Sequence, residues 1–254
     1  MSRAQYHAAL VTGASHRIGR SIAVELAAKG VAVGVHYGTS EDAAHAVVAD
    51  IKAHGGKAGA VQADLASEVD VQKLVSDTAC ALDTPIDVLI NNASIYEEDT
   101  LQTFTSTSWD RHQKINLLAP LMLMQSMATN LPTKNAGAII NIIDQRVLKL
   151  NPQYMSYTTT KAALWAATKT AAQALAPHIR VNAIGPGPTL ANSRQTELDF
   201  AKEAAAVPLG SGATPEEIAK AAGFILEASA MTGQMIALDG GQHLAWHTAD
   251  IPKD

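Results

Sequence analysis

The amino-acid sequence predicts an α/β protein with a single doubly wound, Rossmann-type parallel sheet of about seven strands and helices on both faces. Three observations support this prediction. Apolar runs of strand length alternate with segments of helical periodicity, a glycine turn follows the first run, and no Pro- or Ser-rich linker divides the chain. A chain of 254 residues, 47% hydrophobic and 17% charged, can bury a substantial core, so residues 1–254 are expected to form one domain.

The elements follow one another in a regular order. The first apolar run, Ala8–Val11, ends at a glycine, and Ile18, Ile22 and Leu26 then recur at helical spacing. Further strands are expected at residues 31–35, 58–61, 86–90, 138–143, 179–184 and Met235–Leu238. Helices are expected between them, among them residues 41–54 and a segment marked by Val71, Leu74, Val75, Thr78 and Leu82. This alternation is typical of a parallel sheet that helices cover on both sides.

The last third of the chain contains a helix start and a long irregular segment. Thr214, Pro215 and Glu217 have the pattern of an N-cap, a proline at the first helical position and a capping-box glutamate. The buried stripe of this helix is expected to comprise Ile218, Ala221, Ala222 and Ile225. Residues 186–213 are rich in Gly, Pro and polar side chains and are longer than most connections, which predicts a mobile substrate lid.

Composition narrows the class of partner. A net charge of −5 without a basic cluster argues against nucleic acid and favours a small-molecule substrate. Cys80 is the single cysteine, so an intrachain disulfide and a thiolate metal cluster are excluded, and none of the nine histidines pairs with acidic residues as metal ligands do. Residues 1–7 do not resemble a signal peptide and no apolar stretch reaches membrane-spanning length, so we expect a cytoplasmic protein without metal or membrane contact.

The turn after the first strand is a candidate phosphate site. Its glycines, Gly13 and Gly19, let the backbone approach a pyrophosphate, and the following helix N-terminus favours negative charge. Many strand-to-helix turns use glycine only structurally. This one stands at the first βα junction of a complete alternating pattern, which favours a dinucleotide.

The end of the second strand favours NADP(H) over NAD. An acidic residue there would bind the ribose hydroxyls of NAD, whereas this chain offers His36, Tyr37 and Ser40, and Arg17 could add positive charge from the first turn. The alternative is that the two aromatic residues merely cap an exposed strand end. Glu41, just beyond, weighs against a phosphate.

Polar residues follow the third and fourth strands, where open α/β sheets bind ligands. Asp64, followed by Leu65, could accept a hydrogen bond from an adenine amine, although an N-cap is an equally ordinary role. Asn92, Ala93 and Ser94 follow the fourth strand. These groups are expected to converge on the cofactor.

Tyr157 and Lys161 are the candidate catalytic pair. Four residues apart in helical sequence, their side chains project from one face. An ammonium near a phenol stabilises the phenolate, so we predict that Lys161 lowers the pKa of Tyr157 and makes it a proton donor or acceptor near neutral pH.

Several motifs together resemble the ordered signatures of the short-chain dehydrogenases. They are Thr12-Gly13 with Gly19, Asn91-Asn92-Ala93, Tyr157-Thr-Thr-Thr-Lys161, Pro186-Gly187 and Asp239-Gly240-Gly241. The resemblance spans nearly the whole chain and implies catalysis by Asn116, Tyr157 and Lys161, with cofactor contacts that include Ile18, Pro186 and Gly187. The family's catalytic serine is replaced by Asp144, thirteen positions before the tyrosine.

The departures from the family pattern resemble the pteridine reductase subgroup. An ionised Asp144 cannot donate to a carbonyl, so it must be protonated or must accept from a substrate that donates hydrogen bonds, as pterin rings do. Arg17 replaces the middle glycine of the turn, the second strand ends in His36-Tyr37, and Tyr96 stands where the subgroup stacks an aromatic ring on the pterin. The resemblance implies NADPH-dependent pterin reduction, with Ser94 and Arg17 also contacting substrate.

Other interpretations remain open. Tyr96 could be a loop aromatic that packs on the lid, and Arg17 could serve only to tether phosphate. Asp144 could be ionised and bond to Arg146 or to nearby backbone. Arg146 and Lys149 are expected to be solvated charges. The rival functions are a reductase of ordinary ketones and a non-catalytic NADP-binding regulatory protein.

One helix predicts self-association. Residues 161–176 are nearly apolar on all sides, so one face should pack on the sheet and the other on a neighbouring subunit, which matches the tetramers or dimers of the family. We expect a homotetramer. Trp246 and His247 lie in a tail that either reaches a neighbouring active site or frays.

Overall fold

The structure is a computed structural model and describes residues 6–191 and 195–246. Its strands are β1 (Ala8–Val11), β2 (Ala32–Tyr37), β3 (Ala58–Gln62), β4 (Val88–Asn91), β5 (Gly137–Ile142), β6 (Ile179–Pro186) and β7 (Met235–Leu238). They pair in parallel in the order β3-β2-β1-β4-β5-β6-β7. The predicted fold class is confirmed. Strand order reverses between β1 and β4, which places a crevice at their carboxyl ends.

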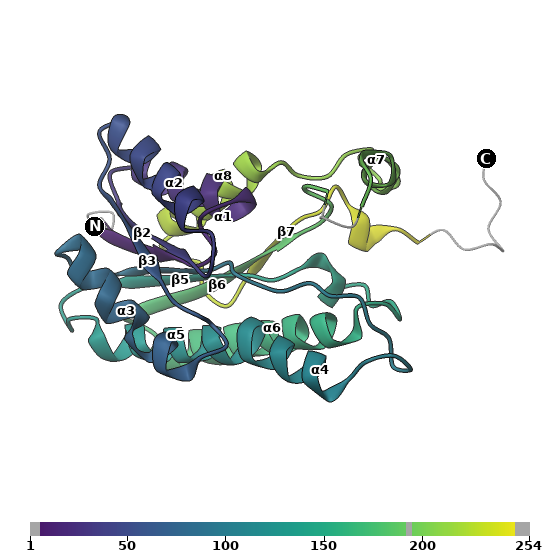
Figure 1. The fold of residues 1–254 in the computed structure, drawn as a ribbon, viewed down its shortest axis with the longest axis horizontal. Helices are drawn as coiled ribbons and strands as arrows, with labels where there is room; N and C mark the ends of the chain where they lie inside the picture. Colours follow the sequence, from purple (N-terminus) through teal and green to yellow (C-terminus); the bar gives the residue numbers. More distant parts are fainter. Residues whose placement is uncertain (1–5, 192–194, 247–254) are drawn as a thin grey trace.

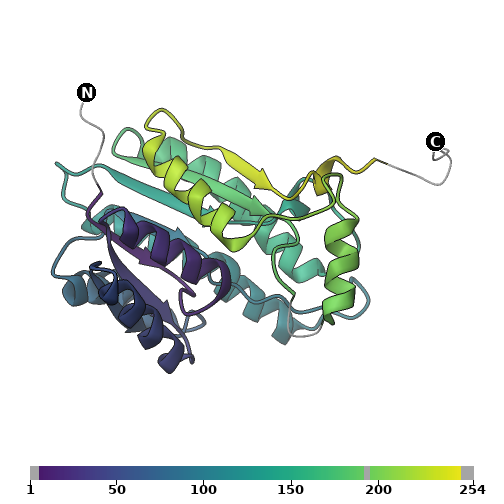
Figure 2. The same ribbon diagram turned by 90° about the horizontal axis from the view of Figure 1, so that it is seen from above.

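Helices cover both faces of the sheet, as Figures 1 and 2 show. One face carries α1 (Arg17–Ala28), α2 (Glu41–Ala53) and α8 (Pro215–Glu227). The other carries α3 (Glu68–Leu82), α5 (Ala119–Asn130) and α6 (Met155–Leu175). The remaining helices are α4 (Ser106–His112), which runs into α5 through the π-helical turn η1 (Gln113–Leu118), then α7 (Glu197–Ala205) and the short turns η2 (Gln145–Val147) and η3 (Gln242–Leu244).

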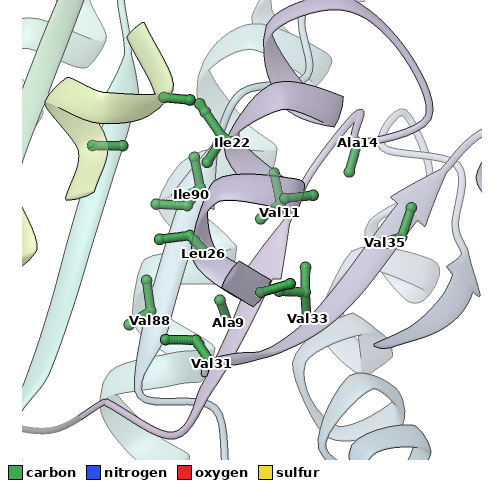
Figure 3. Packing of buried hydrophobic residues seen from close by; sticks show 14 of the residues in the cluster. Ala9, Val11, Ala14, Ile22, Leu26, Val31, Val33, Val35, Val88 and Ile90 are labelled. Carbon is green, nitrogen blue, oxygen red and sulfur yellow. The ribbon is translucent and has the colours of Figure 1, made fainter. Parts of the chain in front are cut away.

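Alternating strand residues fill two cores. Figure 3 shows the core beneath α1, where the labelled strand residues are Ala9, Val11, Val33, Val35, Val88 and Ile90 and the labelled helix residues are Ile22 and Leu26. The strand neighbours Leu10, Leu89 and Ile139 point the other way and pack with Leu74 and Leu123. Both faces of the sheet are therefore buried, which explains why the sequences of its strands are continuous apolar runs.

Element ends differ from the sequence prediction where polar residues take part in strands. β2 continues through His36 and Tyr37, which pair with Val61 and Gln62 of β3. β6 also continues beyond the predicted end, through Gly185 to Pro186, two residues that are more typical of turns. The predicted bounds of β1 and β7 and the capping box at Thr214 are confirmed. No described helix is long and apolar enough to cross a membrane.

Candidate active site

A pocket of about 760 Å³ opens at the carboxyl ends of the central strands. It brings together most of the predicted site residues, namely Gly13, Arg17, Ile18, Gly19, Asn92, Ala93, Ser94, Tyr96, Asp144, Tyr157, Lys161, Pro186 and Gly187. The other predicted residues lie beyond its lining: His36, Tyr37, Ser40, Asp64, Leu65 and Asn116. Among the described residues, no group of three His, Cys, Asp or Glu side chains could hold a metal ion.

The glycine turn is held against the end of β4. Gly13 has a φ of +62°, and a Cβ at this position would come within 3.1 Å of Ala93. The hydroxyl oxygen of Thr12 accepts hydrogen bonds from the backbone N–H groups of Asn92 and Ala93, at 2.9 and 3.0 Å. Thr12 is a positioning residue that the sequence motif contained but did not assign. The turn and the Asn-Asn-Ala segment therefore form one rigid edge of the pocket.

His36 fixes the same turn from the other side. Its Nδ1 accepts a hydrogen bond from the backbone N–H of Gly13 at 3.0 Å, which leaves Nε2 to donate to the carbonyl oxygen of Ala63 at 3.2 Å. The side chain is buried, and burial lowers the pKa of His36 to about 4. At neutral pH the ring is uncharged and both nitrogens are used, so His36 supports the glycine turn and offers no further donor.

We expect this buried histidine to make the protein less stable in mild acid. The folded-state pKa lies below the unfolded value, so the stabilising contribution of neutral His36 is present above pH 6.5 and is lost as the pH falls toward 4. The shift corresponds to about 3 kcal/mol in the free energy of unfolding. The whole of this contribution is lost only below pH 4, so urea unfolding at pH 7 and pH 5 should record a difference of about 2 kcal/mol.

The matched variant is His36→Leu, which leaves the Gly13 N–H without an acceptor. At pH 7 the free energy of unfolding of this variant should be about 1–3 kcal/mol lower than that of the wild type. It should also show a smaller loss of stability between pH 7 and pH 5. Equal pH dependence in the two proteins would contradict the assignment.

The ends of β2 and β3 lie outside the main pocket. Tyr37 is half-buried beside His45, with ring centroids 6.5 Å apart, and Ser40 precedes α2 without a capping bond from its side chain. Asp64 is exposed, and its Oδ1 accepts from the N–H of Ala66 at 2.9 Å. A carboxylate that ends β2 is absent, as predicted, although Glu41 begins the next helix.

Arg17 has a strained backbone and contacts the lid. Its φ of +54° lies in the left-handed region that favours glycine, the residue that the family has there. Its guanidinium donates to the carbonyl oxygens of Leu190 and Ala191, at 2.9 and 2.7 Å. The positive charge therefore faces the start of the predicted lid instead of the end of β2.

The predicted lid partly lines the pocket. The residues that line the pocket include Leu190, Phe200 and Glu203 of this segment, and the last two belong to α7. Residues 192–194 of this segment lie outside the described residues, as does His247 in the tail. Trp246, at the end of the described chain, is exposed.

Asn116 holds the loop that carries Ser94 and Tyr96. It lies in the π-helical turn η1, fully buried, and its carboxamide forms two hydrogen bonds with the backbone of Ile95, at 2.8 and 2.9 Å. Its Nδ2 also lies 3.4 Å from the hydroxyl oxygen of Thr160 on α6. Asn116 thus links the loop after β4 to α6, the helix that carries Tyr157 and Lys161.

Asp144, Tyr157 and Lys161 meet at the bottom of the pocket. The hydroxyl of Tyr157 donates to Oδ2 of Asp144 at 2.9 Å. The ammonium of Lys161 donates to the carbonyl oxygen of Ile142 at 2.8 Å and lies 5.6 Å from the centre of the Tyr157 ring. Tyr157 and Lys161 are buried, and Asp144 is partly exposed as a residue although its carboxyl group lies among buried neighbours. The predicted pair therefore has a carboxyl group as its third member.

The protonation states follow from burial. Burial, followed by the charge of Asp144, raises the pKa of Tyr157 well above its ordinary value. This direction is opposite to the one that we expected from Lys161, because burial outweighs the effect of the nearby charges. Burial raises the pKa of Asp144 and lowers that of Lys161 to about 8. Tyr157 consequently keeps its proton and can act as a donor.

Tyr96 belongs to an aromatic cluster with a cation. Its ring is stacked on Tyr154 at a centroid distance of 4.1 Å and meets Tyr157 edge-on at 4.7 Å. Arg146 donates to the hydroxyl of Tyr96 at 3.0 Å, so the expectation that Arg146 is a solvated charge is wrong. Oδ1 of Asp144 accepts from the backbone N–H of Arg146 at 2.8 Å, one of the alternatives left open above. Neither Arg146 nor Tyr154 was predicted, since no short motif marks them.

The model of the short chain dehydrogenase family matches residues 7–202. The chain therefore belongs to this family of oxidoreductases, as its fold and its Tyr157–Lys161 pair indicate.

Two solved structures are similar over nearly their whole length. FolM Alternative dihydrofolate reductase 1 from Brucella suis, in complex with NADP, has a TM-score of 0.94 and 45% identity and covers 99% of this chain and 100% of its own. The angucycline C-6 ketoreductase LanV, with bound NADP, has a TM-score of 0.88 and 30% identity, with 96% and 98% covered. The curated 3-oxoacyl-(acyl-carrier-protein) reductase FabG of Staphylococcus epidermidis is 35% identical over 241 residues, 93% of this chain and 98% of that protein.

Proposed function

We propose that this protein is an NADPH-dependent reductase that transfers hydride to a pterin or dihydropterin ring. The observation that carries the proposal is the carboxyl group of Asp144, which stands in place of the family's serine and lies 2.9 Å from the hydroxyl of Tyr157. A serine hydroxyl can donate to a ketone oxygen, whereas an ionised carboxylate only accepts and offers two oxygens to the ring N–H and amino groups of a pterin. The 45% identity to FolM supports the same substrate class.

NADP(H) fits the residues at the pocket edge. The turn at Gly13 leaves space that a Cβ would fill, and β2 ends without a carboxylate that would repel a ribose phosphate. We propose that the cofactor is held by Gly13, Ile18, Gly19, Tyr37, Ser40, Asp64, Leu65, Asn92, Ala93, Lys161, Pro186 and Gly187. His36 acts through Gly13, and Arg17 holds the lid over the pocket.

The reaction needs a hydride, which the bound nicotinamide supplies, and a proton. Tyr157 is protonated at neutral pH and donates its proton to a ring nitrogen of the substrate, and the nearby ammonium of Lys161 stabilises the phenolate that is left. Asp144, whose pKa is raised by burial, orients the ring and shares the proton with Tyr157. Lys161 keeps positive charge near both groups below its pKa of about 8, and Asn116 holds the loop that carries Ser94 and Tyr96 against the substrate.

Reduction of an ordinary ketone is the second candidate function. FabG and LanV, whose names describe ketone-type substrates, are 35% and 30% identical to this chain. The two functions differ in the hydrogen bonds that the substrate offers to Asp144: a pterin ring donates from its N–H and amino groups, whereas a ketone oxygen only accepts. A third possibility is a regulatory protein without catalysis. Detection of NADPH oxidation with any substrate would exclude it.

The test measures kcat/KM for dihydrobiopterin, dihydrofolate and a panel of ketones side by side, by following NADPH oxidation. The proposal predicts turnover of at least one pterin with a kcat/KM above that of every ketone. Turnover of ketones alone would replace it with the second candidate.

We also propose that the protein is a cytoplasmic homotetramer. Leu118 and Leu121, beside α6, are each 36% exposed in the single chain, and Ala166 is exposed on α6 itself. Small residues on this helix allow close approach of a second copy. Light scattering should give four times the chain mass of 26.6 kDa, and Ala166→Arg should produce smaller species. A monomeric wild type at micromolar concentration would contradict the assignment.

A further inference from the structure

Three planar groups form one wall of the active-site pocket, which we call the tyrosine–arginine wall: Tyr96, Tyr154 and Arg146. The two tyrosine rings lie parallel within 8°, with centroids 4.1 Å apart. The guanidinium carbon of Arg146 lies 5.0 Å from the Tyr154 centroid and 5.8 Å from the Tyr96 centroid. All three residues line the pocket that holds Asp144.

Arg146 is fixed at both ends of its guanidinium. Nη2 donates to the Tyr96 hydroxyl at 3.0 Å, and Nη1 donates to Oδ1 of Asn151 at 3.0 Å. The same oxygen of Asn151 accepts from the N–H of Gln153 at 3.1 Å, so the segment after η2 is itself braced. This planar, two-point attachment is a property of arginine that lysine does not share.

Tyr154 contributes strain that points to a site. Its φ of +55° and ψ of +48° are left-handed, in a residue with a bulky side chain immediately before α6. A residue in this region costs free energy that surrounding contacts must offset, and such residues cluster at functional sites. Here the conformation accompanies the stack of Tyr154 on Tyr96.

The charge of Arg146 also reaches the proton-carrying groups. It lowers the pKa of Asp144, of Tyr157 and of Tyr96, in opposition to burial, which raises all three. The other charged group that affects Asp144 is Lys161 on α6, and Tyr157 donates to its carboxyl group. Arg17, Glu97 and Glu203 line the same pocket.

We propose that Arg146 is a positioning residue that holds the tyrosine–arginine wall flat and thereby favours planar ring substrates over flexible ketones. One face of Tyr96 is covered by Tyr154, so a substrate ring would stack on the opposite face, beside Tyr157, whose ring meets Tyr96 edge-on at 4.7 Å. A freely rotating Tyr96 would lose rotamer freedom when it stacked on a substrate, whereas a ring held in advance has already lost it. This inference rests on the pterin reduction proposed above, because it explains how the site selects that substrate class.

A double-mutant cycle with Arg146→Met and Tyr96→Phe tests the proposal. Each single variant removes one partner of the 3.0 Å hydrogen bond, and each should raise the KM for dihydrobiopterin by roughly 3- to 10-fold with little change in kcat. The KM of the double variant should be no higher than that of the more impaired single variant, because the hydrogen bond that the two residues share can be lost only once. The KM for a small ketone should change less than twofold. Fully additive effects, or equal effects on ketone and pterin, would overturn the proposal.

Two further variants separate charge from geometry. Arg146→Lys keeps the charge, so its pH–rate profile should match the wild type while its KM for dihydrobiopterin rises. Arg146→Met should move the titration of the Asp144–Tyr157 pair to higher pH, because the opposing positive charge is gone. Lys149→Met removes an exposed cation three residues further along the chain, outside the pocket lining, and should change neither quantity. If Arg146→Met and the wild type have the same pH–rate profile, the proposed effect of the Arg146 charge on the Asp144–Tyr157 pair is wrong.

The outcomes distinguish this inference from the proposed function. If the wild type turns over pterin and Arg146→Met equals it in KM, the inference fails and the function stands. If the wild type reduces no pterin, the function fails, and a crystal structure of Arg146→Met then decides the positioning role. A Tyr96 ring still stacked on Tyr154 in that structure would overturn it.

Discussion

Replacing Tyr157 with phenylalanine is expected to reduce kcat by about 10² to 10⁴-fold, the usual contribution of a positioned general acid. The hydroxyl of Tyr157 is the donor that the pocket directs toward Asp144, and its raised pKa keeps it protonated across the neutral range. Phenylalanine retains the ring that packs edge-on against Tyr96 at 4.7 Å. The variant therefore loses the proton donor while the shape of the site is kept.

Two measurements check this prediction. Stopped-flow or steady-state NADPH oxidation gives kcat, and fluorescence titration gives the Kd for NADPH, which should stay within about twofold because the glycine turn is untouched. Tyr6→Phe is a matched control, since Tyr6 precedes β1 at the opposite end of the sheet and its hydroxyl accepts from Arg180. Full activity of the Tyr157 variant would contradict the mechanism.

Replacing Asp144 with serine is expected to lower kcat/KM for dihydrobiopterin by roughly 10- to 150-fold, the effect of losing a hydrogen bond that involves a charged group. Serine restores the family residue but is too short to keep both bonds of the carboxyl group, which joins the Tyr157 hydroxyl to the Arg146 N–H. If the protein is instead a ketone reductase, the same change should raise kcat/KM for ketones.

Asp144→Asn is the companion variant. It has nearly the same shape as the wild-type side chain, but it carries no titratable proton and its amide can no longer accept at both positions. We expect it to lose pterin turnover at all pH values, whereas a purely structural role of Asp144 would leave activity close to wild type. Thermal unfolding of both variants checks that the fold is retained.

Apolar periodicity predicts the sheet because every strand is buried on both faces. β1 and β7 have the predicted bounds, and the capping box at Thr214 begins α8 as expected. Where polar residues lie inside strands, periodicity misses them: His36 and Tyr37 belong to β2 because they pair with β3. The signal for a strand is hydrophobic, whereas its end is set by backbone pairing.

The candidate site was predictable only where a motif marks it. Residues that belong to a recognisable motif, such as Tyr157 and Lys161, meet in the pocket as expected. Local chemistry was less predictable, because burial decides it: His36 is neutral and internally bonded, and the pKa of Tyr157 is raised. In the sequence Arg146 looks like an ordinary surface cation, and the proposal that it positions Tyr96 became possible only when the structure placed it against two tyrosines that are far apart in the chain.

The most direct test of the central claim follows the hydride itself. The protein is incubated with dihydrobiopterin and NADPH that carries deuterium at both C4 positions of the nicotinamide, and the product is examined by mass spectrometry. The account predicts a tetrahydropterin that is heavier by one deuterium bound to a ring carbon, formed by the wild type and lost with Tyr157→Phe. A pterin that stays unreduced while ketones acquire the label would contradict it.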